Sequence, residues 1–208
     1  MLMPFRFKQF SVEDDQSSMR IGTDAILLGA WAEVKSAKNI LEIGTGCGVI
    51  ALMMAQRSSA NITAIDIHKD SVEQATVNFR SSPWTERLTS LNISCKEFAC
   101  TSEKDFDLVI SSPPFFSKSL KSPYGGRNLA RHDDTLTIDE LFDAVFMLFK
   151  GHQNPACTVH HHSLNIIIPS SKTNDVVERA NRLGFDLKKQ LFIFPKPGKP
   201  ANRVIMEF

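Results

Sequence analysis

The chain has 208 residues, a length typical of a single domain. Hydrophobic residues make up 42% and charged residues 23%, which is typical of a folded protein and excludes a disordered chain. Lysine and arginine (24) nearly balance aspartate and glutamate (23), so a nucleic-acid partner would have to be bound by local basic patches rather than by overall charge.

Membrane insertion and export are not indicated. No apolar run approaches the roughly 18–20 residues of a membrane span, and the first residues lack the charged-then-apolar pattern of a signal peptide. The four cysteines, Cys47, Cys95, Cys100 and Cys157, form no CxxC pair, which is typical of a reducing compartment. We therefore expect a cytoplasmic protein.

From residue 38 onward, short apolar runs alternate with helical patterns. Strands are expected at 39–43, 61–67, 88–94, 107–111 and 164–168, and helices at 49–56, 69–80, 138–149 and 172–183. On the helix 69–80, burial is expected for Val72, Ala75 and Val77. The runs 185–194 and 204–208, separated by prolines and a glycine, predict a terminal hairpin.

This alternation predicts an α/β fold with a mostly parallel sheet covered on both faces. Ligands of such sheets bind beyond the carboxyl ends of the strands, which here are followed by loops 44–48, 66–68, 95–98 and 112–134. Loop 195–201 opens on the same edge if the last strand is antiparallel. The polar stretch 151–163 is predicted to be a surface insertion; its His160, His161 and His162 lack a recognised zinc spacing, so no metal site is expected.

The most informative loop follows the strand 39–43. Gly44, Gly46 and Gly48 allow a sharp turn and the close approach of a ligand to the main chain. Their spacing is not the G-x-G-x-x-G of a nicotinamide or flavin site, which disfavours an oxidoreductase. Glu42 would repel a phosphate and suits an ammonium or hydroxyl group, and Asp66 ends the next strand, where a carboxylate accepts hydrogen bonds from ribose hydroxyls. The alternative is a tight strand-to-helix turn with no ligand.

These residues resemble the class I S-adenosylmethionine-dependent methyltransferases, which have a Rossmann-like, seven-stranded sheet ending in an antiparallel hairpin. The resemblance implies one domain over residues 1–208, with residues 1–37 covering the cofactor. It also implies that Glu42, Gly44, Thr45, Gly46 and Gly48 hold the methionine part of the cofactor, Asp66 and Ile67 the ribose side, and Glu97 and Phe98 the adenine. An aspartate is more usual at position 97.

A second motif follows the strand 107–111. In Ser112-Pro113-Pro114-Phe115, the prolines stiffen the backbone and leave carbonyl acceptors without neighbouring N–H donors. Such acceptors orient a weakly nucleophilic exocyclic amine, and an aromatic side chain stacks on its ring. The motif resembles the Asn/Asp/Ser-Pro-Pro-Tyr/Phe/Trp sequence of amino-methyltransferases. Ser112 stands where an RNA enzyme is expected to have asparagine. The alternative is a stiff loop that ends a buried strand.

Two segments are basic and free of acidic residues. The segment 115–132 contains Lys118, Lys121, Arg127 and Arg131, and the segment 187–206 contains Lys196 and Lys199; all six are candidate contacts to RNA phosphates. A solvated basic loop is the alternative for each segment.

A narrower resemblance covers nearly the whole chain except 151–163. The segments 7–10, 19–31, 128–133 and 203–208 resemble those of the bacterial tRNA1(Val) adenine-N6 methyltransferases. The resemblance implies cofactor contacts by Arg20 and Thr23, and methylation of an unpaired adenine next to the anticodon by a protein expected to be monomeric. Two alternatives stay open, which are another amine acceptor (an rRNA base or a protein glutamine) and an RNA-binding module with weakened catalysis.

Overall fold

The computed structural model describes residues 3–114, 136–151 and 162–208. The main strands are β3 (Asn39–Ile43), β4 (Asn61–Asp66), β5 (Leu88–Asn92), β6 (Leu108–Ser111), β7 (Ser163–Pro169), β8 (Lys189–Ile193) and β9 (Arg203–Glu207). The α-helices are α1 (Thr23–Trp31), α2 (Val49–Arg57), α3 (Lys69–Arg80), α4 (Cys95–Thr101), α5 (Ile138–Gly151) and α6 (Thr173–Arg182). Two short strands, β1 (Phe5–Arg6) and β2 (Ser11–Val12), pair with each other.

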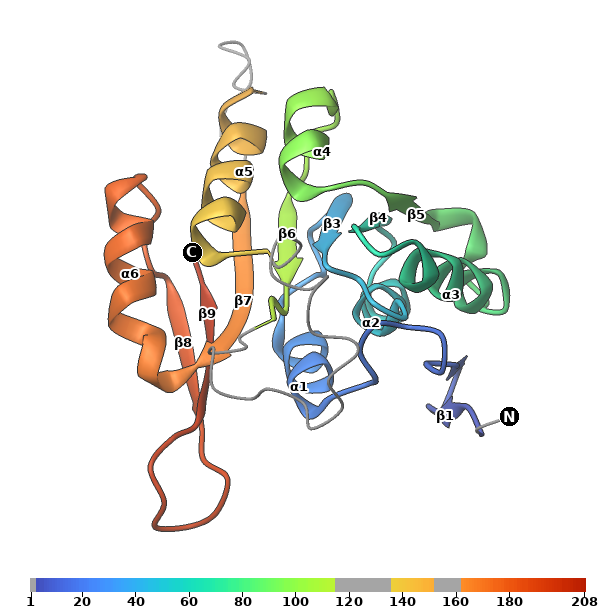
Figure 1. Cartoon of the computed structure of the whole chain (residues 1–208), viewed down its shortest axis with the longest axis horizontal. Helices are drawn as coiled ribbons and strands as arrows, with labels where there is room; N and C mark the ends of the chain where they lie inside the picture. The colour runs from blue at the N-terminus through green and yellow to red at the C-terminus, as the bar shows by residue number, and fades with distance from the viewer. Residues whose placement is uncertain (1–2, 115–135, 152–161) are drawn as a thin grey trace, which may run out of the picture.

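Within the described residues, the seven main strands form one sheet in the order β5-β4-β3-β6-β7-β9-β8 (Figure 1). Pairing is parallel from β5 to β7, and β9 is antiparallel to both β7 and β8. The expected parallel sheet with a terminal antiparallel hairpin is therefore confirmed. Because β8 runs in the direction of β7, the loop after β8 opens at the carboxyl edge, as predicted.

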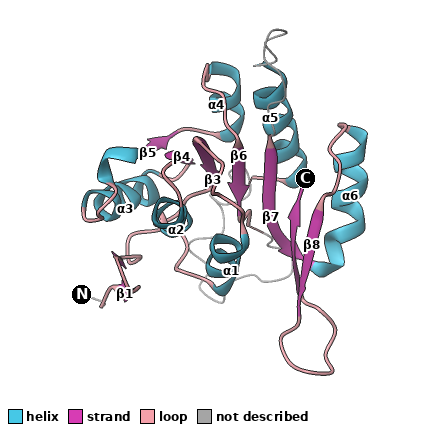
Figure 2. Ribbon diagram, turned by 180° about the vertical axis from the view of Figure 1, so that it is seen from behind, coloured by secondary structure: helices cyan, strands magenta, loops and turns pink. Residues whose placement is uncertain are grey.

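The helices cover both faces of the sheet (Figure 2). One core lies between the sheet and α1, α2 and α3, and the other between the sheet and α4, α5 and α6. Strand β6 shows the alternation that divides them, since Leu108 and Ile110 face the first core and Val109 faces the second. Both faces of β6 are thus apolar, which is what a central parallel strand requires.

Three expectations about elements were wrong. The strand expected at 88–94 ends at Asn92, and the expected loop 95–98 is the first turn of α4. Ser94 caps this helix, accepting a hydrogen bond from the Glu97 amide at 3.1 Å. On α3, Val77 is 48% exposed rather than buried. The buried face of α3 instead includes the polar residues Ser71, Gln74 and Asn78, which contact the N-terminal segment, as described below.

Most of the predicted insertion 151–163 lies outside the described residues. Its two ends are Gly151, the last residue of α5, and His162 and Ser163 at the start of β7. Where the chain is described, no helix is both long and apolar enough to cross a bilayer.

Candidate cofactor and substrate site

The glycine loop is tied to the neighbouring strand. The amides of Gly44 and Thr45 both donate to the Ile65 carbonyl, at 2.9 and 3.0 Å. Gly44, Gly46 and Gly48 all have positive φ angles, of 77°, 55° and 84°, a region that side chains with a Cβ rarely adopt. The conformation of the loop is therefore fixed by its hydrogen bonds to β4. Its backbone is accessible to a ligand at Gly44, which is exposed.

Gly48 is also required for packing. It precedes α2, and a Cβ built on it would lie 2.5 Å from Cε1 of Phe79 and 3.2 Å from Cβ of Ala75. By contrast, a Cβ at Gly44 would meet nothing within 4 Å. The two glycines have similar backbone angles and different surroundings. Gly48 allows α2 and α3 to pack closely, whereas Gly44 leaves open space at the carboxyl edge of the sheet.

Glu42 is buried beneath the loop and is only 1% exposed. Its Oε2 accepts hydrogen bonds from the Thr45 hydroxyl at 2.7 Å and the Ala51 amide at 3.0 Å. Its Oε1 has no hydrogen-bond partner. Burial raises the pKa of Glu42 to about 8, against the lowering effect of these two hydrogen bonds, and the charge of Asp66 raises it further. A buried carboxyl oxygen without a partner destabilises the protein unless a ligand supplies a donor.

Asp66 joins the end of β4 to both adjacent loops. Its Oδ2 accepts from the Gly46 amide and its Oδ1 from the His68 amide, each at 2.9 Å. A carboxylate accepts about four hydrogen bonds, so each oxygen keeps capacity for a hydroxyl donor. Ile67 follows with 41% of its surface exposed, and Asn92 holds this strand end by donating to the carbonyls of Asp66 and Ile67.

A segment that we call the strap, residues 13–18, lies along α3 beside the glycine loop. Three buried polar side chains of α3 hold it: Asn78 bonds both the amide and the carbonyl of Glu13, Gln74 accepts from the Gln16 amide, and Ser71 accepts from the Ser18 amide. Asn78 also donates to the Cys47 carbonyl at 2.8 Å. These three residues were not identified as functional from the sequence. Their spacing at positions 71, 74 and 78, which puts them on one face of the helix, could have indicated a polar contact surface.

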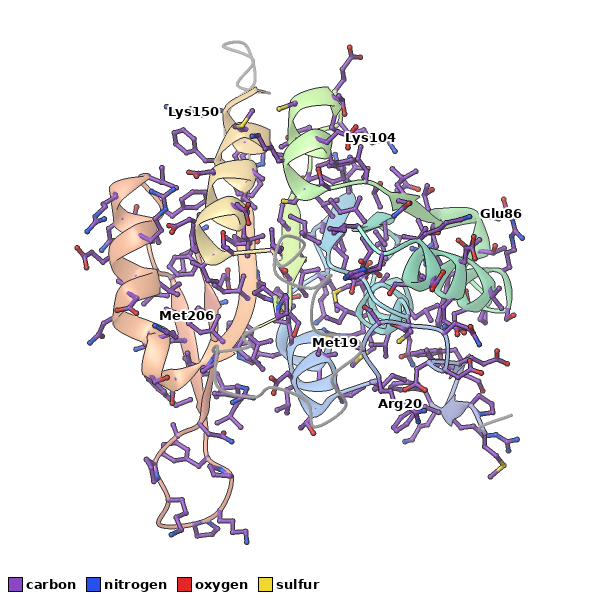
Figure 3. All side chains as sticks on the ribbon, viewed as in Figure 1. Met19, Arg20, Glu86, Lys104, Lys150 and Met206 are labelled. Carbon is purple, nitrogen blue, oxygen red and sulfur yellow. The ribbon has the colours of Figure 1, made fainter. Side chains whose placement is uncertain are left out.

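The strap brings one further polar group to the loop. The hydroxyl oxygen of Ser17 is buried without a hydrogen-bond partner, and a Cβ at Gly46 would lie 3.4 Å from it. Of the two predicted contacts further along, Arg20 is exposed beside Met19 (Figure 3), and Thr23 is exposed at the first position of α1.

The Ser-Pro-Pro segment leaves the sheet beside the glycine loop. Ile43 and Ser111 are register partners on the adjacent parallel strands β3 and β6, and the Ser111 hydroxyl donates to the Ile43 carbonyl at 2.8 Å. Gly44 and Ser112 therefore begin neighbouring loops at the same level, about 4.8 Å apart by the spacing of strands. Ser112 is half-buried and Pro113 buried. Phe115, Lys118, Lys121, Arg127 and Arg131 lie outside the described residues.

Glu97 and Phe98 lie on α4 and differ in what they present. Glu97 is exposed, whereas Phe98 is buried in the second core with its ring centroid 6.0 Å from that of Phe106. Of the two residues, only Glu97 offers an open side chain to a ligand.

Cys47 lies in the glycine loop without serving as a nucleophile. It is 3% exposed, and burial raises the pKa of its thiol to about 12, with further raising from the charges of Glu42 and Asp14. A thiol of this pKa is protonated at neutral pH and does not react.

Lys196 and Lys199 lie at the tip of the hairpin, which we call the arm (residues 189–207). The Lys199 amide donates to the Lys196 carbonyl at 3.2 Å, and Gly198 has a φ of 75°. With Pro197 at the second position, these features define a type II turn. The arm is joined to α1 by an ion pair, in which Nε of Arg203 lies 2.7 Å from Oδ2 of Asp24.

Comparison with known proteins agrees with this geometry. The family described as "Methyltransferase small domain" matches residues 17–132. Proteins named tRNA1(Val) (adenine(37)-N6)-methyltransferase are similar over nearly the whole chain. The one from Phocaeicola vulgatus is 45% identical and the one from Trichodesmium erythraeum 38% identical, each over 98% of this chain and 82% of the relative.

Solved structures share the fold at low identity. A predicted O-methyltransferase from Agrobacterium tumefaciens superposes with a TM-score of 0.62 and 18% identity, covering 89% of this chain and 79% of that one. TrmK of M. capricolum, solved with S-adenosyl-homocysteine, gives 0.58 and 13%, covering 90% and 67%. The family match over residues 17–132 and the relatives at 45% and 38% identity establish the assignment: the chain belongs to the methyltransferase small domain family and, within it, to the tRNA1(Val) (adenine(37)-N6)-methyltransferases.

Proposed function

We propose that this protein methylates N6 of an unpaired adenine next to the anticodon of tRNA, using S-adenosylmethionine. The observation that carries the proposal is the register of Ile43 with Ser111. Because of this register, the glycine loop and the Ser-Pro-Pro segment begin at adjacent positions on one edge of the sheet. Oε1 of Glu42, which has no hydrogen-bond partner, is buried next to the glycine loop. A site for a cofactor with an ammonium group and a site for an amine are therefore neighbours.

The residues at the glycine loop fit the cofactor. Oε1 of Glu42 is a buried acceptor in need of a donor, which the ammonium of the methionine part supplies. The exposed Gly44 allows close backbone approach, and Asp66 has acceptor capacity left for the ribose hydroxyls. Ile67 offers an exposed apolar side chain next to Asp66 and Thr45 holds Glu42 in place, while Arg20, Thr23 and Glu97 are exposed and are proposed as further contacts.

The residues at the second loop orient the amine. When bound, the cofactor supplies an electrophilic methyl group on a positively charged sulfur. The Ser112 hydroxyl oxygen and the Pro113 carbonyl accept hydrogen bonds from the two N–H groups of the adenine amine. This would turn the nitrogen lone pair toward that methyl. Among the described residues, no donor reaches the Pro113 carbonyl. Transfer would form a C–N bond as the C–S bond breaks, and the proton lost from the nitrogen would pass to water. Phe115 stacks on the adenine ring, and Pro114 fixes the corner between them.

The substrate class rests on the relatives, whose name specifies adenine 37 of tRNA1(Val). An adenine in the anticodon loop is already unpaired, so moving it into a site costs less than flipping a base out of a duplex. The basic residues Lys118, Lys121, Arg127, Arg131, Lys196 and Lys199 would bind the surrounding phosphates. We propose that the chain acts as a cytoplasmic monomer without a metal ion.

The proposal is tested with cofactor carrying a labelled methyl group and total RNA, followed by nuclease mapping of the label. Label at one adenine of the anticodon loop is expected. Label in rRNA, or only in protein, would contradict it, and so would tight tRNA binding by a protein that does not bind the cofactor.

Two variants separate the cofactor site from the substrate site. Asp66→Ala is expected to weaken cofactor binding in calorimetry, whereas Phe115→Ala leaves it nearly unchanged and slows turnover. Normal turnover of Phe115→Ala would show that the stacking role is wrong. Ser112→Asn is expected to preserve or raise activity, and an inactive Ser112→Asn variant would show that serine serves another acceptor.

A further inference from the structure

The arm extends past the rest of the molecule at the carboxyl edge of the sheet (Figures 1 and 2). Every residue from Phe194 to Pro200 is exposed. Three large apolar side chains on the arm are exposed as well: Leu191 by 41%, Phe192 by 39% and Phe194 by 61%. An exposed aromatic ring next to exposed lysines, on a projection without a packing partner among the described residues, calls for an explanation.

The arm is rigid where it leaves the sheet. The Asn202 amide donates to the Ile193 carbonyl at 3.0 Å, which continues the hairpin beyond the last strand residues. On one side, Ser170 bonds the loop twice, from its hydroxyl to the Ala201 carbonyl at 2.5 Å and from its amide to the Asn202 carbonyl at 3.2 Å. On the other side, Arg203 pairs with Asp24 of α1. These contacts fix the base of the arm and therefore the direction in which it leaves the sheet.

The charges of the arm are divided between its base and its tip. At the base, Lys189 pairs with Glu207 at 3.4 Å and Arg203 pairs with Asp24. At the tip, neither Lys196 nor Lys199 has an ion-pair partner in the described part of the chain. The type II turn places these two lysines at its first and fourth positions, whose Cα atoms lie within about 7 Å of each other. The tip thus presents two uncompensated positive charges close together.

The position of the arm decides what it can reach. From β6, which carries the Ser-Pro-Pro segment, to β8 are three strand spacings, or about 14 Å. A target base held at Ser112 cannot also contact the tip of the arm. The arm is instead suited to nucleotides that flank the target.

We propose that the arm binds RNA on one side of the target adenine, with Phe194 stacked on an unpaired base and Lys196 and Lys199 neutralising phosphates. The inference rests on the proposed function for the identity of the RNA. Stacking on aromatic side chains accepts any base, so the arm contributes affinity and register, while the Ser-Pro-Pro segment selects the amine.

The test measures affinity for an anticodon stem-loop separately from turnover. Phe194→Ala is expected to raise Kd and KM for the RNA about tenfold with kcat unchanged, because stacking is lost. Phe194→Trp retains a ring and is expected to bind as wild type. Phe194→Leu retains most of the apolar surface and is expected to bind as weakly as Phe194→Ala. Equal affinity of the Leu and Trp variants would overturn the stacking role.

The lysines are tested by salt dependence. Lys196→Ala with Lys199→Ala is expected to reduce the slope of log Kobs against log salt by about 1.4, as expected for two contacts to a single strand. The matched control is Lys35→Ala with Lys104→Ala. It removes the same charge from segments that precede β3 and β6, at the opposite edge of the sheet (Lys104 in Figure 3), and the slope should not change.

The outcomes distinguish this inference from the proposed function. If the protein methylates tRNA and its arm variants keep the wild-type affinity and salt slope, only the proposal that the arm binds RNA would be overturned. A wild-type protein that neither binds nor methylates tRNA would overturn both. Melting temperatures of all variants are expected to match the wild type, since the changed side chains are exposed.

Discussion

The two ends of the carboxyl edge are built differently. At the glycine loop, Glu42, Asp66 and Asn78 are buried and hydrogen-bonded within the chain, and only Oε1 of Glu42 and the hydroxyl of Ser17 are buried there without a partner among the described residues. At the arm, the rings and charges are exposed, and only the base is tied down. Substitutions at the loop should therefore change stability and cofactor binding together, whereas substitutions at the arm should change RNA binding alone.

The largest effect is expected from Gly48→Ala. The new Cβ meets the Phe79 ring at 2.5 Å and the residue must keep a positive φ, so we expect about 3 kcal/mol of destabilisation from overpacking and strain together. Gly44→Ala, which has the strain without the clash, should cost about 1 kcal/mol. Urea unfolding of both variants measures the difference. Equal losses would show that α3 does not confine the loop.

Asn78→Ala should cost about 2 kcal/mol, because it leaves the Cys47 carbonyl and both backbone groups of Glu13 without a partner. Since the strap would loosen, cofactor affinity should fall as well. Val77→Ala, an exposed neighbour on α3, is the control and should stay within about 0.5 kcal/mol. An Asn78 variant with lowered stability and unchanged cofactor affinity would separate the strap from the cofactor site.

Glu42 should make stability depend on pH. Its pKa is about 8 in the folded chain against an ordinary value of 4.5, so between these values the folded state holds a proton that the unfolded state releases. Stability should fall as pH rises through this window, by at most about 1.4 kcal/mol per pH unit. Glu42→Gln should abolish this slope in urea unfolding from pH 5.5 to 7.5. A slope that persists in the Gln variant would assign it to other groups.

The same carboxyl couples cofactor binding to pH. An ammonium ligand at Oε1 favours the ionised form, so binding should release a proton. Affinity should rise with pH up to about 8, by at most about tenfold per unit. Calorimetry in two buffers of different ionisation enthalpy counts the protons, and no release below pH 7.5 would contradict the contact.

Arg203→Met should have the smallest effect on stability, about 0.5 kcal/mol, because its ion pair with Asp24 is partly exposed. The KM for tRNA should nevertheless rise, since the arm loses one of its two supports. Lys189→Met, which removes the pair with Glu207 at the far end of the hairpin, should leave KM unchanged. If both variants behave alike, the direction of the arm does not depend on α1.

Hydrophobic pattern predicted the centre of the sheet well because β3, β4, β6 and β7 are almost entirely buried and therefore form continuous apolar runs. The pattern predicts a helix from Lys69 to Arg80, and these bounds of α3 are confirmed. Its buried face was harder to predict. Ser71, Gln74 and Asn78 look solvated in a sequence, and only the strap that covers them makes them interior, whereas Val77 faces solvent.

The helix α4 was missed for a different reason. Its seven residues are too few for a clear periodicity. The alternating apolar residues Leu91 and Ile93 favour a longer preceding strand than the one observed. The pair Ser94 and Glu97 has the spacing of a capping box, which predicts a helix start. The type II turn at Lys196–Lys199 was likewise readable from its proline and glycine, but the direction of the arm depends on Ser170 and Asp24, which are distant in sequence.

The inert thiol of Cys47 has a practical consequence for anyone who wishes to watch the RNA bind. Among the cysteines that the structure describes, Cys47 and Cys95 are buried, with thiol pKa values raised to about 12, while Cys100 is exposed on α4. A maleimide dye should therefore modify Cys100 and spare Cys47 and Cys95, and replacing Cys157, which lies outside the described residues, by serine would restrict the label to Cys100.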